Sequence, residues 1–166
     1  MNKSSKKSVV GFDQHDHKRC VQRSLKEADS YCLKNQLRFT EVRRRTLGIL
    51  LESHVAMGAY DVLERLKLEG LGSKPPIAYR ALNFLLENGF IHRIERLNAF
   101  VACAHPGANH HPAFLICSDC GNVAEAAVSP DTDALSRTAE QNGFQIEHTT
   151  IEAEGQCPGC LSQVST

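Results

Sequence analysis

The sequence contains no long hydrophobic run. No stretch of 18 apolar residues occurs in the chain, so the sequence predicts no transmembrane helix. The N-terminus, residues 1–14, is basic and polar and has no apolar segment like the centre of a secretory signal peptide. We therefore expect a cytoplasmic protein without membrane contact, in which the seven cysteines stay reduced.

Two sequence motifs of zinc enzymes are also missing. The His-Glu-x-x-His motif of metalloproteases does not occur. Nucleobase deaminases need a His-x-Glu motif before a Cys-x-x-Cys pair, and no His-x-Glu occurs. The sequence therefore predicts a protein that is not an enzyme.

Positive charge is nearly absent from the second part of the chain. Residues 97–166 contain one of the 19 Lys and Arg residues and eight of the 19 Asp and Glu residues. Residues 1–96 contain the other 18 basic residues against 11 acidic ones. The net charge of zero thus hides a basic part and an acidic part. A basic segment of this kind favours a polyanionic partner.

Cysteine, in contrast, forms two Cys-x-x-Cys pairs, Cys117/Cys120 and Cys157/Cys160. Two such pairs in a reduced chain predict four thiolates around one tetrahedral zinc ion. The gap of 36 residues between the pairs is longer than in a usual zinc ribbon, and a strand, a helix and a strand are expected to fill it. A redox dithiol at 157–160 is the alternative. It is disfavoured because the motif lies at the chain end and not at a strand-to-helix junction.

Further metal-ligand residue types surround the first cysteine pair: His92, Cys103, His105, His110, His111 and Glu125. One sulfur, two imidazoles and one carboxylate form a tetrahedral set that suits Zn²⁺ better than Fe²⁺ or Mn²⁺. His92, Cys103, His110 and Glu125 are the predicted set, with His105 and His111 as alternative loop ligands. Four protein ligands leave no open position for catalysis.

Apolar spacing predicts four helices followed by a hairpin. The helices are expected over residues 18–34, 41–52, 59–69 and from Pro75 to a stop at Gly89. Strands 90–95 and 99–103 follow, with a turn at Leu97-Asn98. This order is that of a winged helix-turn-helix domain, predicted over residues 18–96 after a flexible tail at 1–17.

The acidic part predicts a small α/β domain over residues 97–166. Strands are expected at 113–116 and 122–128, a helix from Ser129 to Glu140, and an alternating strand at 144–152. The edge of such a sheet can pair with a second copy of the chain. The predicted fold class is α+β, with an N-terminal winged helix-turn-helix domain and a C-terminal dimerisation domain held by the four-cysteine zinc site.

The polar face of the fourth helix fits the DNA major groove, which admits one α-helix. Arg80 is the best candidate for reading bases, because a guanidinium can contact O6 and N7 of guanine together. The other candidates would contact phosphates or sugars: Tyr60, Lys74, Tyr79, Arg43, Arg44 and Arg45. An ordinary solvated helix face is the alternative, and the positive charge of residues 1–96 favours DNA.

Several motifs together resemble the ferric uptake regulator (Fur) family, and within it the zinc-responsive branch. They are Ala59-Tyr60-Asp61-Val62-Leu63, residues 74–85 (KPPIAYRALNFL), Gly89-Phe90-Ile91-His92, residues 110–121 (HHPAFLICSDCG) and residues 151–157 (IEAEGQC). The resemblance covers about residues 20–161.

The resemblance implies a homodimeric repressor that binds operator DNA when it is loaded with zinc and controls zinc uptake genes. It implies two zinc ions per chain, one structural and one regulatory, held by the two ligand sets given above. Zinc would fix a hinge near residues 96–99. The Thr-Pro-Gln-Arg segment of the family appears here as Thr40-Glu41-Val42-Arg43. A sensor of iron, manganese or peroxide with the same architecture is the alternative, although Pro112-Ala113 replaces the His-x-His of iron-type members.

Overall fold

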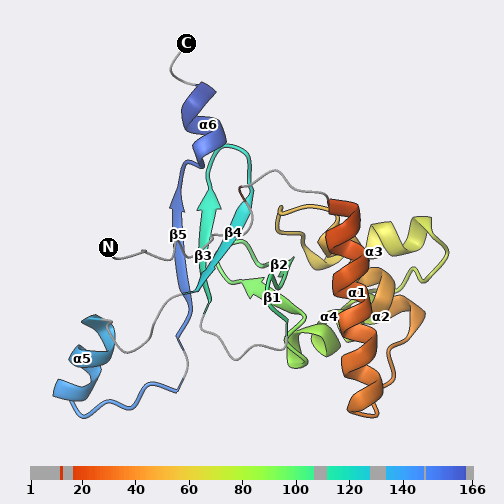
Figure 1. Cartoon of the computed structure of the whole chain (residues 1–166), viewed down its shortest axis with the longest axis horizontal. Coiled ribbons are helices and arrows are strands. Elements are labelled where there is room, and N and C mark those ends of the chain that lie inside the picture. Colours follow the sequence, from red (N-terminus) through yellow and green to blue (C-terminus); the bar gives the residue numbers. More distant parts are fainter. Residues whose placement is uncertain (1–11, 13–16, 107–111, 128–133, 148, 164–166) are drawn as a thin grey trace, which may run out of the picture.

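The structure, a computed structural model, describes residues 12, 17–106, 112–127, 134–147 and 149–163. The elements in chain order are α1 (His17–Lys34), α2 (Glu41–Leu51), α3 (Ala59–Leu68), α4 (Pro75–Glu87), β1 (Ile91–Ile94), β2 (Ala99–Ala102), β3 (Pro112–Cys117), β4 (Val123–Ala127), α5 (Ala134–Gln141), β5 (Ile151–Gly155) and α6 (Pro158–Gln163). In Figure 1 helices α1–α4 lie on one side, β3–β5 lie on the other, and the β1–β2 hairpin lies between them. Among the described helices, none has the length and apolar character needed to cross a membrane.

Local signals place the helices where the sequence predicts them. The Thr40 hydroxyl accepts a hydrogen bond from the Arg43 N–H at 3.4 Å, so Thr40 caps α2. Pro75 opens α4, where a missing N–H costs nothing. Apolar residues of α2, α3 and α4 then meet in one core, which includes the fully buried Ile49, Leu50, Leu66, Leu82 and Leu85. This core fixes the orientation of α4.

The C-terminal sheet has the strand order β4–β3–β5. Strand β3 pairs antiparallel with β4 and parallel with β5. Phe114 on β3 is opposite Glu125 on one side and Glu152 on the other. Because directly paired residues point to the same face of a sheet, these three residues form one row.

The β1–β2 hairpin packs on this sheet and joins the two parts of the molecule. A second core contains Ile94 and Val101 of the hairpin with Phe114, Ile116 and Val123 of the sheet. The Val123 N–H also donates to the carbonyl oxygen of His54 at 2.8 Å. The helical part and the sheet are therefore in direct contact through both side chains and backbone.

The predicted joint between the two parts lies within the β1–β2 hairpin. The residue pair Ile94↔Ala99 closes the β1–β2 hairpin, and the Asn98 N–H donates to the Glu95 carbonyl at 3.1 Å. The division expected after Arg96, and the hinge expected at 96–99, thus fall in this hydrogen-bonded turn.

The strand predicted at 144–152 is wrong over most of its length. Strand β5 spans Ile151–Gly155, where it pairs in parallel with Ala113–Cys117 of β3. Phe144 and Ile146 instead line a groove with α5. Helix α6 was not expected from the sequence. The predicted tail and the start of the helix expected from Ser129 lie outside the described residues, except that α1 already begins at His17.

Candidate metal centres and nucleic-acid interface

The two Cys-x-x-Cys pairs come together at one end of the sheet. Cys117 ends β3, Cys120 lies in the following turn, and Cys157 and Cys160 lie around the start of α6. The four sulfurs lie within 4.8 Å of one another, and the Cys117–Cys160 and Cys120–Cys157 separations are both 3.8 Å. Four sulfurs at the usual Zn–S distance around a tetrahedral ion would be about 3.8 Å apart. The geometry therefore fits a tetrahedral zinc site.

The charges at this cluster also favour a cation. The backbone N–H groups of Cys120 and Cys157 point at the Cys117 sulfur and lower the pKa of its thiol to about 6. The neighbouring Cys157 sulfur raises the pKa of Cys160 to about 12. One thiolate thus forms readily at neutral pH, whereas further negative charge on the adjacent sulfurs is disfavoured unless a metal ion compensates it.

The second set brings ligand atoms together from distant parts of the sequence. His92 on β1, Cys103 after β2 and Glu125 on β4 have ligand atoms within 4.8 Å of one another. Nε2 of His92 lies 3.5 Å from Oε2 of Glu125. The Ala104 N–H donates to the same carboxylate oxygen at 2.8 Å and holds it toward Cys103. The ring of His92 packs on Phe114, with centroids 5.3 Å apart.

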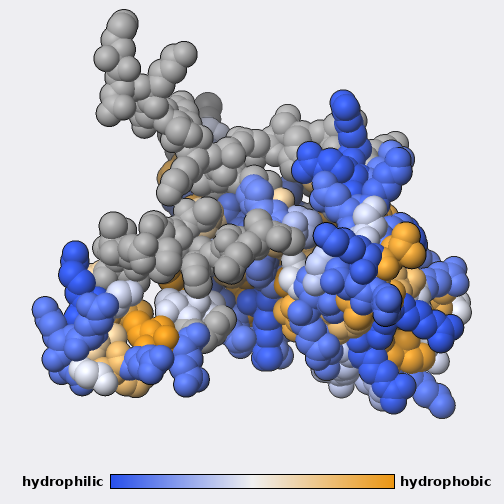
Figure 2. All heavy atoms as spheres, turned by 60° about the horizontal axis from the view of Figure 1, so that its bottom comes forward, coloured by the Kyte–Doolittle hydropathy of each residue, from blue (hydrophilic) through white to orange (hydrophobic). Residues whose placement is uncertain are grey.

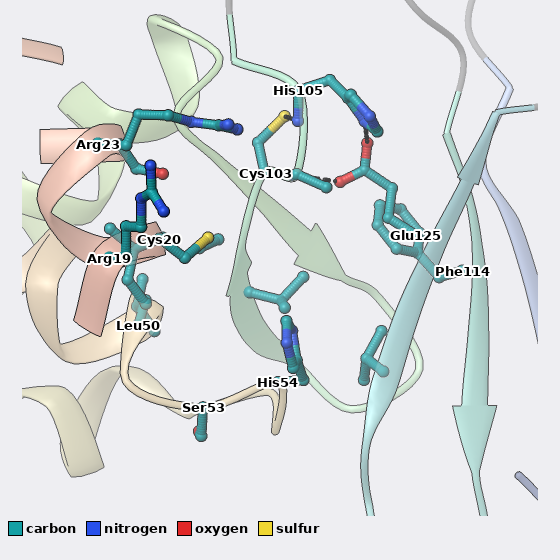
Figure 3. Close-up of a pocket in the computed structure, with 16 residues that line it drawn as sticks. Arg19, Cys20, Arg23, Leu50, Ser53, His54, Cys103, His105, Phe114 and Glu125 are labelled. Carbon is teal, nitrogen blue, oxygen red and sulfur yellow. Dashed lines mark hydrogen bonds and ion pairs between the residues drawn. The ribbon is translucent and has the colours of Figure 1, made fainter. Parts of the chain in front are cut away.

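Two acidic groups of this set are buried side by side. Cys103 and Glu125 are 4% and 6% exposed. Burial, and then the nearby Glu125 carboxylate, raise the pKa of the Cys103 thiol to about 12. Both groups face a cavity of about 540 Å³ between α1, the end of α2 and the sheet (Figure 3). A divalent cation would offset the cost of burying a thiolate next to a carboxylate.

The fourth predicted ligand, His110, and its alternative His111 lie outside the described residues. The other alternative, His105, is described. Its Nδ1 lies 3.9 Å from Oε1 of Glu125, and its ring points to that carboxylate in Figure 3. His105 is not a member of the group whose ligand atoms lie within 4.8 Å. The structure thus brings together three of the four predicted ligands.

The predicted DNA-reading face of α4 is exposed. Tyr79, Arg80 and Asn83 are exposed, while Ala78, Leu82 and Leu85 on the opposite face are buried in the core. Tyr60 at the start of α3 is 68% exposed. Lys74, the N-cap residue of α4, is exposed as well. Four of the seven residues predicted to contact DNA therefore have side chains open to solvent on α3, on α4 or at the residue before α4.

The arginines of α2 have partners within the protein. The Arg43 guanidinium lies 3.7 Å from the centroid of the Phe84 ring, and Arg44 pairs with Asp29. Arg45 contacts carboxylates of Glu52 and Glu69 and so ties α2 to α3. These contacts occupy the side chains within the helical part. Contact of the three arginines with DNA stays a prediction.

Three described residues near the candidate sites, Arg93, Asn98 and Glu152, were not predicted from the sequence to have a role. Arg93 and Asn98 of the hairpin are hydrogen-bonded at 2.9 Å and line a cleft with Tyr60, Tyr79 and Asn83. Glu152, which had no predicted role, contacts the backbone of the hairpin turn. The sequence signal for Glu152 was the segment Ile151-Glu152-Ala153-Glu154, in which acidic and apolar residues alternate.

Comparison with known proteins agrees with this architecture. The model of the ferric uptake regulator family matches residues 34–154. The zinc uptake regulation protein of Escherichia coli (strain K12) is 36% identical over 145 residues, which are 87% of this chain and 85% of that protein. The ferric uptake regulation protein of Neisseria meningitidis serogroup B is 28% identical over 130 residues, or 76% of this chain and 88% of that protein.

Two solved structures show the same fold. A zinc uptake regulator complexed with zinc and DNA matches with a TM-score of 0.81 at 35% identity, covering 88% of this chain and 98% of that one. The crystal structure of holo XcZur matches with a TM-score of 0.70 at 35% identity, covering 87% and 96%. Since the family model covers most of the sequence and a relative over 30% identical spans nearly all of it, the chain belongs to the ferric uptake regulator family.

Proposed function

We propose that this protein is a zinc-dependent repressor that binds operator DNA as a homodimer when zinc is bound and controls zinc uptake genes. One observation carries the proposal. Ligand atoms of His92 in the hairpin next to the DNA-reading helix and of Glu125 in the C-terminal sheet lie within 4.8 Å of each other and of the Cys103 sulfur. A metal ion bound there would join the two parts of the molecule.

Two ligand sets would hold two zinc ions per chain. Cys117, Cys120, Cys157 and Cys160 would hold the structural ion, and four thiolates with no open position suit that role. His92, Cys103 and Glu125, with His110 as fourth ligand, would hold the regulatory ion. A thiolate in the second set favours zinc over iron or manganese. When bound, zinc would compensate the negative charge of the ligands at each set and hold them together.

The switch follows from where the ligands are attached. His92 moves with the hairpin and α4, whereas Glu125 belongs to the sheet. When His92 and Glu125 are held together, the position of α4 relative to the C-terminal part is fixed. Two such helices in a dimer must be spaced by about one DNA helical turn to contact two half-sites. A hundredfold change in affinity requires only about 2.7 kcal/mol of coupling.

The direct test is binding of a fluorescent operator duplex at increasing buffered free zinc, with metal content per chain measured in parallel. We expect tight binding only when about two zinc ions are bound per chain. Parallel titrations with Fe²⁺ and Mn²⁺ test whether the protein responds to iron or manganese instead of zinc. Stronger DNA binding with either of these metals than with zinc would contradict the proposal.

An exposed apolar groove supports a homodimer. Leu135 of α5 is 52% exposed and Phe144 is 66% exposed, and both line a groove of about 450 Å³ with Ala139 and Ile146. Figure 2 shows hydrophobic side chains at the surface of the α5 lobe on its left. The partner we infer is a second copy of this chain, because two equivalent half-sites require two equivalent reading helices.

Leu135→Asp should shift the dimer toward monomer. Fully burying a leucine contributes about 1.5–3 kcal/mol, and about half of that burial remains for Leu135, so replacing it by a charge in both chains should weaken dimerisation by roughly 10-fold or more. Sedimentation velocity over a concentration series measures this. The matched control is Leu33→Asp on α1, where the leucine is 84% exposed and no change is expected. Equal dimerisation of both variants would place the interface elsewhere.

Arg80→Ala should remove discrimination between operator and random duplex while zinc content stays the same. The loss expected for one bidentate contact to guanine is about 1–3 kcal/mol. Competition binding with operator and scrambled duplexes measures it. Lys74→Ala is the comparison, because loss of a phosphate contact should weaken binding to both duplexes equally and lower the salt dependence by about one charge. Full operator preference in the Arg80 variant would refute base reading by α4.

A further inference from the structure

The turn of the β1–β2 hairpin is held by a carboxylate from the far strand of the sheet. The Glu95 N–H donates to Oε1 of Glu152 at 2.6 Å, and the Arg96 N–H donates to Oε2 at 3.0 Å. Both oxygens of one side chain are thus used on two consecutive amides. Bonds from N–H groups to an ionised carboxylate are about twice as strong as neutral ones. Residue 152 lies 56 positions beyond Arg96, so this is a tertiary contact between the two parts.

The position of Glu152 in the sheet relates this contact to the predicted metal ligand Glu125. Glu125, Phe114 and Glu152 form one row across β4, β3 and β5. Phe114 packs on the hairpin residues Ile94 and Val101 in the middle of that row. Glu125 lies next to His92 at one end, and Glu152 holds the hairpin turn at the other. The same row therefore contacts the hairpin at two separate points.

We propose that Glu152 is a positioning residue that presents His92 to the regulatory metal site. The inference rests on the proposed zinc-dependent function, since it describes how that site is prepared. His92 and Glu95 belong to the same short hairpin, with two residues between the metal ligand and the amide that Glu152 holds. Holding the turn limits the rotation of the hairpin on the sheet. His92 then lies near Cys103 and Glu125 before metal binds, and less ordering remains to be done on binding.

A neighbouring residue provides a matched comparison. Glu154 lies on the same strand and face as Glu152 and pairs with the Arg96 side chain. Its ion pair is open to solvent, with side chains 61% and 41% exposed for Arg96 and Glu154. Exposed pairs of this kind contribute little to stability. Glu152→Gln and Glu154→Gln thus remove the same charge from the same strand, but only the first removes bonds to the hairpin backbone.

The first measurement is amide hydrogen exchange of Glu95 and Arg96 by NMR on the full chain, without DNA. We expect both amides to be protected in the wild-type protein and to exchange about tenfold or more faster in the Glu152→Gln variant, which keeps only one accepting oxygen. The Glu154→Gln variant should leave both amides protected. Unprotected wild-type amides, or equal protection in the Glu152 variant, would overturn the proposal. This result does not depend on whether the protein binds DNA.

The second measurement is operator binding against free zinc. For Glu152→Gln we expect the zinc concentration at half-maximal binding to rise about tenfold, with the binding at saturating zinc retained. A general structural defect would instead lower the maximum and the thermal midpoint. For Glu154→Gln a shift below about threefold is expected. An equal rise of the half-maximal zinc concentration in both variants would contradict the proposal, because it would show that the lost charge, and not the lost hydrogen bonds to the Glu95 and Arg96 amides, causes the effect. If the wild type showed no zinc response, the proposed function would be refuted. The amide exchange would still show whether Glu152 holds the hairpin turn.

Discussion

Cys103→Ser is expected to abolish zinc-dependent DNA binding while leaving a folded dimer. Cys103 belongs to the three-ligand group with His92 and Glu125 and is 4% exposed. Serine has almost the same shape, but its hydroxyl is a poor zinc ligand, so the regulatory ion should be lost. Operator affinity at a fixed free zinc concentration should fall about 100-fold. Zinc content should fall from about two ions to about one per chain.

The control for this prediction is Cys20→Ser. Cys20 on α1 lines the same cavity as Cys103 but is not part of the three-ligand group. Its replacement should leave zinc content and DNA binding unchanged. Sedimentation of both variants should match the wild type, and both should unfold in a cooperative transition. The midpoint of the Cys103 variant should fall only by the stabilisation that the regulatory ion contributes. Unfolding of the Cys103 variant to a monomer would show that Cys103 has a structural role instead.

Cys157→Ser is expected to have the largest effect on stability. Cys157 is 7% exposed, and its backbone N–H donates to the Cys117 sulfur at 3.3 Å, so it belongs to the centre of the four-cysteine cluster. Structural zinc sites contribute about 10–16 kcal/mol of apparent binding energy that is also folding energy. A loss of even about 5 kcal/mol would lower the Tm by roughly 10–20 °C for a chain of this size.

Thermal unfolding followed by circular dichroism, together with zinc content, tests this prediction. The variant should lose the structural ion, β5 and α6 should lose their attachment to β3, and the dimer should dissociate. Removal of zinc from the wild type by a strong chelator should give the same result, and added zinc should reverse it. A Cys157 variant with unchanged Tm and full zinc content would show that the four cysteines do not form a structural site.

The sequence predicted the helical part well because its signals are local. The capping residue Thr40, the prolines before α4 and the apolar face of Ala78, Leu82 and Leu85 are all read within a few positions of the chain. Helix boundaries depend on such nearby residues. For this reason the exposed face that carries Tyr79 and Arg80 was also predicted correctly.

The strand at 144–152 shows where local pattern fails. Its alternation is real, but a strand forms only where it pairs with a neighbouring strand, and the pairing of β5 with β3 begins at Ile151, which is opposite Ala113. The arginines of α2 show the same limit. Whether Arg45 faces solvent or ties two helices depends on Glu69, which is 24 residues away. Neither outcome can be read from a short window of sequence.

The sequence by itself determined which chemistry is present: two Cys-x-x-Cys pairs, a set of further zinc ligand types, and a basic part next to an acidic one. Each cysteine pair is short-range, so its two sulfurs must turn toward the same point. Only the tertiary structure decided which distant groups meet. The register of β3 with β4 and β5 places Glu125 and Glu152 at the two ends of one row, against the same hairpin. If the register of β4 and β5 against β3 shifted by one residue, both carboxylates would point to the opposite face of the sheet, because side chains alternate along a strand.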